Sequence, residues 1–325
     1  MTAQQRLVLI DEDASGPGGT NQMAMLALLR APRVEVLGIT TVTGDASSAE
    51  AVRHTLRLLE IIGRTDVPVV PGAAAPLVRT PEDTRLAAQL YGRATWLGAW
   101  GRPESKSMPE GEPSTKPAAE DAAHFLVRQV RSHPGNITIF AGGPLTNIAL
   151  ALAIEPNFAK LTSGIVLMGG SLNPRTDDPE FATSPRHEFN FWFDPEAAHK
   201  VLRAPWPRID VTTVDASLQV PFNQSTLDAD ARAESPAARY IAKYSKPESY
   251  MWDELAACAL LDPTLITQSR VLYMDVDLSH GPSYGHTLTW SGQLKPDAPV
   301  RQVRAHVAVN APRFYKFFVD LIARP

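Results

Sequence analysis

The sequence has little cysteine, no long hydrophobic run and no block of basic residues. Cys258 is the one cysteine in 325 residues, so the chain cannot form an internal disulfide. No apolar run approaches the roughly 18 residues that span a membrane, and the apolar part of the N-terminal segment is too short for a signal peptide. The net charge of −4, without basic clusters, argues against nucleic-acid and membrane partners. We therefore expect a soluble cytoplasmic protein.

Apolar residues, by contrast, are plentiful and arranged in short runs. They make up 44% of the chain, enough for a sizeable core, and we expect one domain over residues 1–325. Runs rich in valine and isoleucine predict strands, and the patterns between them predict helices. The strands are expected at 7–10, 34–42, 67–70, 137–141, 164–169 and 208–214, and the helices at 21–30, 48–63, 118–133, 146–154 and 194–203. This alternation is typical of an α/β fold with a mostly parallel sheet flanked by helices.

The rest of the chain divides into irregular segments and a C-terminal part with further strands. Residues 98–117 and 172–187 are rich in Gly, Pro, Ser and charge, and they predict long surface loops. Such loops are either binding loops or plain surface insertions. Strands are expected at 271–278, 286–290 and 304–309, followed by a last helix at 311–323.

Acidic residues and glycines meet in DEDASGPGGTNQ, residues 11–22, between the first strand and the first helix. The stretch has no lysine for a Walker phosphate loop, and Asn21 stands where a dinucleotide fingerprint needs its third glycine. The adjacent acids would repel a pyrophosphate, whereas Ca²⁺ or Mg²⁺ prefers carboxylate oxygens. Strand alternation places Asp11 and Asp13 on one face and Glu12 on the other. The stretch is thus either a metal site or a solvated acidic turn.

Five further stretches occur in a characteristic order: TTVTGD (40–45), GGPLTNIALAL (142–152), LMGGS (167–171), EFNFWFDPEAA (188–198) and WDELAACALLDP (252–263). With the opening stretch, they make the chain resemble the inosine/uridine-type nucleoside N-ribohydrolases, from Leu7 to about Leu321. The resemblance implies a Rossmann-like nucleoside hydrolase fold and calcium-dependent cleavage of a ribonucleoside to ribose and free base. It also implies that the chain forms a homodimer or a homotetramer. The implied binding partner is a small-molecule nucleoside.

The resemblance also implies roles for particular residues. Asp13 corresponds to a residue that binds calcium and is the catalytic base, and Asp11, the first aspartate of the same pair, is a further implied metal ligand. The other implied calcium ligands are Thr146, through its backbone carbonyl, and Asp253. Residues implied at the ribose are Asp45, Met168, Glu188 and Asn190.

Two departures from the family pattern concern the metal and the sugar. Asn21 and Gln22 stand where two aspartates are usual, and the preceding turn is longer. Asn21 can still bind a ribose hydroxyl and Gln22 can still offer an oxygen to calcium, but the charge falls by up to two units. Ala182 stands where an asparagine is usual before the EFN motif, and Asn173 is the candidate to replace it.

Trp252 stands where some family members have a histidine, which resembles the purine-preferring branch. A tryptophan stacks well on a purine base; otherwise it is a core residue. Trp96 or Trp100 either adds a second stacking face or anchors its loop. His54, His124 and His199 lie in helix patterns and are expected at the surface or in packing. For His286 a structural role is weighed against an approach to the site, and Cys258 is expected to be an inert core thiol.

Two other functions are compatible with the altered opening loop. One is hydrolysis of a different N- or C-glycoside, because the loop reshapes the ribose end of the site. The other is nucleoside binding without turnover by a protein whose metal site is weakened.

Overall fold

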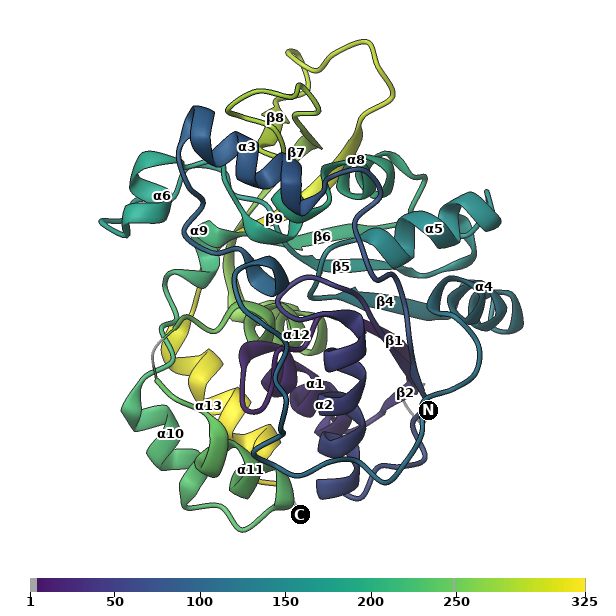
Figure 1. Ribbon diagram of the computed structural model, residues 1–325, viewed down its shortest axis with the longest axis vertical. Coiled ribbons are helices and arrows are strands. Elements are labelled where there is room, and N and C mark those ends of the chain that lie inside the picture. The colour runs from purple at the N-terminus through teal and green to yellow at the C-terminus, as the bar shows by residue number, and fades with distance from the viewer. Residues whose placement is uncertain (1–4, 248, 325) are drawn as a thin grey trace.

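The computed structural model describes residues 5–247 and 249–324. The described strands form one nine-stranded sheet in the order β3-β2-β1-β4-β5-β6-β9-β7-β8 (Figure 1). Their bounds are β1 Arg6–Glu12, β2 Val34–Thr41, β3 Val69–Val70, β4 Ile137–Ala141, β5 Gly164–Met168, β6 Ile209–Thr212, β7 Ile266–Val276, β8 Thr287–Trp290 and β9 Arg301–Val309. The pairings from β3 to β9 in this order are parallel, and β7 runs antiparallel to both β9 and β8. The predicted α/β fold with a mostly parallel sheet is confirmed.

Helices cover both faces of this sheet. One buried core includes residues of α1, α2, α12 and α13, and the other includes residues of α4, α5 and α8. The helices are α1 Thr20–Arg30, α2 Ser48–Ile61, α3 Pro81–Tyr91, α4 Ala122–Ser132, α5 Thr146–Ile154, α6 Pro179–Thr183, α7 Phe189–Phe193, α8 Pro195–Arg203, α9 Val214–Ser217, α10 Gln224–Ala231, α11 Pro236–Tyr244, α12 Trp252–Leu261 and α13 Ala311–Ile322. No helix within the described residues is long and apolar enough to cross a membrane.

The order in which the parallel strands are added to the sheet switches sides at β1, and this switch places the site. From β1 the chain adds β2 and β3 on one side, and later β4, β5 and β6 on the other. In such sheets ligands bind beyond the carboxyl ends of the strands at the switch point. The acidic opening stretch follows the carboxyl end of β1 and therefore lies at this crevice.

Two almost fully buried helices bring distant residues to the crevice. In α1 the residues from Asn21 to Leu29 are all buried, and in α12 those from Asp253 to Leu260 are all buried. Because both helices are apolar on every side, they pack in the core rather than at the surface. They lie against each other, so Asn21 and Asp253, both in first turns, come close together.

The remaining differences from the sequence expectations lie in short or exposed elements and in two helices that were missed. The helices α3, α7, α9, α10 and α11 were not predicted, the short helix α6 forms within the expected loop 172–187, and β7 begins at Ile266 rather than at 271. The segment 101–117 is irregular, as expected. The helices α6, α7 and α9 have at most five residues, α3 has one buried residue and the start of β7 is mostly exposed, so none of these shows a long apolar run.

Candidate functional site

A cavity of about 590 Å³ opens at the carboxyl ends of the central strands. One part of its wall is polar and includes Asp13, Asn21, Asp45, Glu188, Asn190 and Asp253. Another part is aromatic and includes Trp96, Phe181, Phe189, Tyr250 and Trp252. A cavity with these two parts suits a ligand that joins a polyhydroxylated group to a flat ring.

Three carboxylates converge on one amide group in the polar part of the wall. The Nδ2 of Asn21 lies 2.8 Å from Asp13 Oδ1, 3.0 Å from Glu12 Oε2 and 3.2 Å from Asp253 Oδ2. All four side chains are buried. We call Glu12, Asp13, Asn21 and Asp253 the carboxylate cluster.

The position of Glu12 corrects the sequence expectation. Alternation was expected to turn Glu12 away from Asp13, but both reach the same amide. The strand β1 ends at Glu12, so the alternation does not continue to Asp13. A Cβ added at Gly142, at the end of β4, would lie 2.4 Å from Glu12 Oε1. The glycine therefore leaves the space that this carboxylate uses.

The carboxylate cluster carries more negative charge than its surroundings balance. Burial raises the pKa of Glu12, Asp13 and Asp253 well above the usual range, and neighbouring carboxylates raise it further. Glu12 Oε1, Asp253 Oδ1 and Asn21 Oδ1 are buried without a hydrogen-bond partner among the described residues. Such oxygens are ready to accept a hydrogen bond or to bind a cation.

Asp45 links the carboxylate cluster to the aromatic part of the wall. Its backbone N–H donates to Asp13 Oδ2 at 2.7 Å, and its Oδ1 accepts from Trp96 Nε1 at 2.5 Å. A Cβ added at Gly44 would lie 2.1 Å from Asp13 Oδ2, so this close approach requires glycine. Asp13 is thereby held by Asn21 on one oxygen and by Asp45 on the other.

The EFN motif supplies a second, rigid part of the polar wall. Glu188 caps α7, and its oxygens accept N–H bonds from Gly170, Asn190 and Phe191 at 2.8–3.0 Å. Burial raises its pKa, whereas these bonds favour the charged form. Asn190 Nδ2 donates to the carbonyls of Gly142 and Met168, which leaves its Oδ1 to face the cavity.

Two of the three tryptophans singled out from the sequence line the cavity, and the third packs elsewhere. Trp252 lies 5.2 Å from the ring of Tyr250 and 6.0 Å from that of Phe181, between centroids, and all three line the cavity. Trp96 also lines it, but Trp100 does not and instead packs at 4.3 Å on Phe193. Of the two loop tryptophans, Trp96 is thus the one placed to face a ligand, and Trp100 anchors its loop.

Three of the predicted metal ligands do not line the cavity. Asp11 lies beneath it, where Thr40 and Asn147 donate to its Oδ1, and burial raises its pKa to about 7. The hydroxyl of Thr146 donates to Asp194 at 2.6 Å. Both amide atoms of Gln22 are buried without a partner among the described residues.

The lengthened opening turn has a packing reason. A Cβ at Gly16 would lie 2.3 Å from Gln22 Nε2 and 2.9 Å from His54 Cγ. Gly18 has φ +75°, packs on the backbone of Tyr244, and donates its N–H to the Tyr240 hydroxyl at 3.2 Å. The turn therefore covers Gln22 and His54 and seals α1 against α2 and α11, without offering a phosphate cradle.

The other residues weighed from the sequence lie outside the cavity lining. His54 is buried and bonded to Glu110, His124 is exposed, and His199 binds Asp275. His286 contacts Ser184, Asn173 and Ala182 are exposed, and Cys258 is fully buried in α12. The expectation that Asn173 replaces the missing asparagine therefore gains no support, because its backbone N–H binds Asp215 outside the cavity.

The oxygens of the carboxylate cluster match the chemistry of a hard divalent cation. Among the described residues, no group of three or more Asp, Glu, His or Cys side chains is arranged so that it could hold a metal ion. The amide of Asn21 lies between the carboxylates and holds them apart. Asp13 and Asp253 reach the cavity from two elements, and their unbalanced charge fits such an ion.

Comparisons with known proteins agree with this geometry. The model of a family described as inosine-uridine preferring nucleoside hydrolase matches residues 8–316. A probable uridine nucleosidase of Arabidopsis thaliana is 31% identical over 97% of each chain. An inosine-uridine preferring nucleoside hydrolase of Leishmania major is 28% identical over 98% of each. Among solved structures, a plant nucleoside hydrolase superposes with a TM-score of 0.78 at 25% identity, covering 99% of this chain and 100% of its own.

Proposed function

The chain belongs to the inosine-uridine preferring nucleoside hydrolase family and is a nucleoside N-ribohydrolase; we propose that its reaction requires a divalent cation, with Ca²⁺ first, and favours purine nucleosides. The observation that carries this proposal is the two-part cavity, polar at the carboxylate cluster and aromatic around Trp252. A ribose fits the polar part and a base fits the aromatic part.

Hydrolysis at this site adds the hydroxide of water to the anomeric carbon and breaks the glycosidic C–N bond, and the base takes up a proton from the solvent as it departs. The transition state resembles an oxocarbenium ion. Asp13 takes the proton of the water, because its carboxylate lines the cavity and is oriented through both oxygens. A bound cation supplies water of lowered pKa and a fixed point for the sugar hydroxyls.

The ribose is oriented by groups that are themselves held in place. The carboxylate of Glu188 is fixed by three backbone N–H groups and accepts from a hydroxyl. Asn190 Oδ1 and the amide of Asn21 complete this set, and Asp45 and Met168 line the wall beside it. Preorganised acceptors of this kind stabilise the positive charge that develops on the sugar.

The purine preference rests on the aromatic part of the cavity. The ring centroid of Trp252 lies 5.2 Å from that of Tyr250 and 6.0 Å from that of Phe181. Trp96 adds a further ring on the wall. Because stacking grows with the overlapping ring area, a two-ring purine gains more here than a pyrimidine.

The test is release of ribose from inosine, adenosine, guanosine, uridine and cytidine, with Ca²⁺ and with chelator. We expect calcium-dependent hydrolysis, fastest for the purines. Faster hydrolysis of uridine or cytidine would contradict the purine preference, and equal rates in chelator would contradict the role of the metal. Light scattering tests the expected homodimer or homotetramer.

A second candidate is nucleoside binding without turnover, favoured by Asn21 and Gln22 in place of acids and by the position of Gln22 outside the cavity lining. Nucleoside binding by calorimetry, with no ribose released from any of the five nucleosides in calcium, would support it. Release from a different glycoside alone would favour the altered-substrate alternative.

A further inference from the structure

The carboxylate cluster contains one acceptor too many for the amide at its centre. An amide nitrogen carries two hydrogens, yet three carboxylate oxygens lie within 2.8–3.2 Å of Asn21 Nδ2. At least one of the carboxylates therefore faces the others without a hydrogen between them. Buried like charges at this spacing repel strongly unless one of them is protonated or a cation joins them.

The protein itself supplies no such cation among the described residues. The charged groups that act on Glu12 and on Asp253 are other carboxylates. The nearby Arg102 is bonded to Glu50 and to the backbone carbonyl of Asp45, and it does not reach the cluster. Glu12 Oε1 and Asp253 Oδ1 remain buried and without partners.

The expected contributor from α1 does not fill this role. Gln22 lies under the opening turn beside Gly16 and Gly19, and no hydrogen bond among the described residues joins its amide to the carboxylate cluster. Glu12 approaches from the strand instead, in the space left by Gly142, and its carboxylate reaches the same amide as those of Asp13 and Asp253. The strand thus offers the third acidic group that the start of the helix lacks.

We propose that Glu12 is a direct ligand of the catalytic divalent cation, together with Asp13 and Asp253, in place of Gln22. This inference rests on the metal dependence in the proposed function and names its ligands. It explains how the site keeps three carboxylates although α1 begins with two amides. It also explains the glycine at 142, where any side chain would displace the Glu12 carboxylate.

The test is calorimetric titration of CaCl₂ into the wild-type protein, Glu12→Gln and a matched control, Glu254→Gln. Glu254 is also a fully buried glutamate at the edge of the cluster, but it accepts from the hydroxyl of Thr20, whereas Glu12 accepts from the amide of Asn21. We expect at least about a tenfold loss of calcium affinity in Glu12→Gln and less than about a threefold loss in Glu254→Gln, because a carboxylate ligand is removed only in the first.

Melting temperatures in chelator give a second readout, which a merely structural role would move in the opposite direction. Glu12→Gln should melt at or above the wild-type temperature in chelator, because the change removes a buried like charge. It should then gain less than the wild type when calcium is added. A purely structural Glu12 would give a lower melting temperature in chelator and an unchanged response to calcium.

Equal calcium affinity in Glu12→Gln and wild type, or an equal loss in Glu254→Gln, would overturn the proposal. So would a wild-type protein that binds none of Ca²⁺, Mg²⁺ and Mn²⁺. Failure of the proposed function is separable, because it is read from ribose release. If the protein binds calcium through Glu12 but hydrolyses no nucleoside, the proposal on Glu12 stands and the proposed function fails.

Discussion

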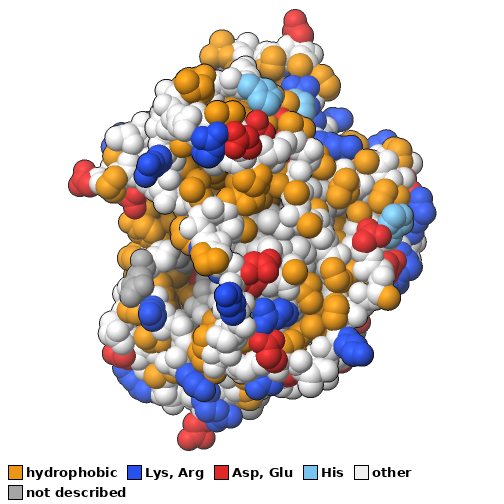
Figure 2. Space-filling view, viewed as in Figure 1, with side chains coloured by type: hydrophobic (Ala, Val, Ile, Leu, Met, Phe, Trp, Pro, Cys, Tyr) orange, Lys and Arg blue, Asp and Glu red, His pale blue; other side chains and the backbone are white. Residues whose placement is uncertain are grey.

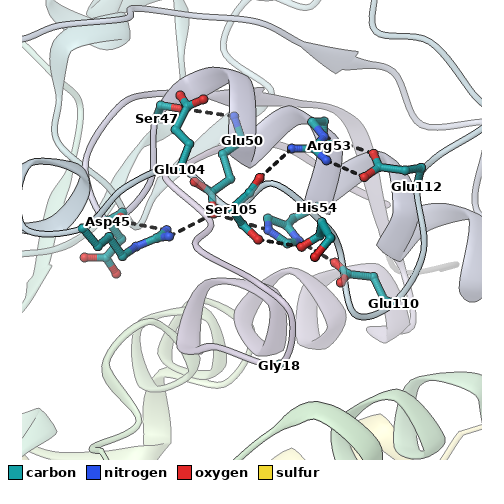
Figure 3. A network of polar contacts seen from close by, with 12 residues as sticks. Gly18, Asp45, Ser47, Glu50, Arg53, His54, Glu104, Ser105, Glu110 and Glu112 are labelled. Atoms are coloured by element: carbon teal, nitrogen blue, oxygen red, sulfur yellow. Dashed lines mark hydrogen bonds and ion pairs between the residues drawn. The ribbon is translucent and has the colours of Figure 1, made fainter.

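Two buried polar groups lie on either side of the opening turn, and they differ in how their charges are balanced. In the carboxylate cluster, three acids share one amide and several oxygens lack partners. In the second group, which we call the α2 network, His54 lies between Glu50 and Glu110 (Figure 3), and Arg102 also contacts Glu50. His54 contacts Glu110 through Nδ1 and lies 3.6 Å from Glu50 through Nε2, while Arg102 reaches Glu50 at 3.0 Å.

The α2 network fastens an irregular segment to the helix. Ser47, which caps α2, bonds to Glu104, and Arg53 of α2 bonds to Glu112; both glutamates lie in the segment 101–117 (Figure 3). Acidic and basic side chains accordingly lie next to each other near the middle of the face in Figure 2, over α2. The pairing fixes the segment that follows Trp96, so this network has a structural role.

The difference shows which buried charge is reserved for a ligand. Burying a charge is costly, and a fold offsets the cost by pairing it with an opposite charge or with donors. In the α2 network each carboxylate contacts His54 or Arg102, whereas the charged groups that act on Glu12 and Asp253 are other carboxylates. Substitutions in the carboxylate cluster and in the α2 network test this difference.

The largest effect is expected for Asp13→Asn in the carboxylate cluster. The change removes the proton acceptor while the hydrogen-bonding shape of the side chain is kept, so kcat for inosine should fall by about a thousandfold or more. Steady-state ribose release measures it, with circular dichroism as the check on folding. A fall of less than tenfold would exclude Asp13 as the base.

The next largest effect is expected for His54→Ala in the α2 network. It leaves the buried Glu110 carboxylate without its hydrogen-bond partner, and an unsatisfied buried polar group costs roughly 1–3 kcal/mol of unfolding free energy. Urea unfolding measures the loss, while kcat per folded molecule should change little. An unchanged stability combined with a large loss of kcat would reverse the roles assigned to the two groups.

Removing divalent cations should affect stability through the carboxylate cluster alone. At a calcium concentration of about 100 times Kd, binding adds about 2.7 kcal/mol to the folded state. Wild type and His54→Ala should therefore show the same calcium-induced rise in melting temperature, and Asp13→Asn a smaller one. Thermal unfolding with calcium and with chelator checks this. An unchanged response in Asp13→Asn would place the ion elsewhere.

The smallest effect is expected for the aromatic part of the cavity. Trp252→Ala should raise KM for inosine by about tenfold, because stacking on an aromatic side chain contributes roughly 1–3 kcal/mol per base. It should raise KM for uridine less. Trp100→Ala is the matched control, because that ring packs on Phe193 and does not line the cavity. Equal changes for both nucleosides would remove the basis of the purine preference.

The sequence was sufficient for the parts of the molecule governed by apolar periodicity. The parallel strands and the buried α1 and α12 follow from runs such as LVLI and LAACALL. The grouping of Asp13, Asn21, Glu188, Asn190 and Asp253 around one cavity was also expected from the order of the motifs. These residues follow strand ends or begin helices, where backbone geometry fixes their direction.

Other features depend on contacts that one sequence does not reveal. The predicted direction of the Glu12 side chain was wrong because the strand ends at that residue. The space beside Gly142 decides where its carboxylate lies. Gln22 is turned away by a glycine turn whose packing against His54 is non-local. The difference between Trp96 and Trp100 likewise depends on how the segment folds over Phe193.

The most direct test of the account is a crystal structure of the wild-type protein soaked in calcium. The account predicts a calcium ion in the carboxylate cluster, with oxygens of Asp13, Asp253 and Glu12 at about 2.3–2.6 Å, and no ion in the α2 network. A calcium ion bound elsewhere, or a carboxylate cluster without an ion in saturating calcium, would contradict the claim that unpaired buried charge marks the functional centre.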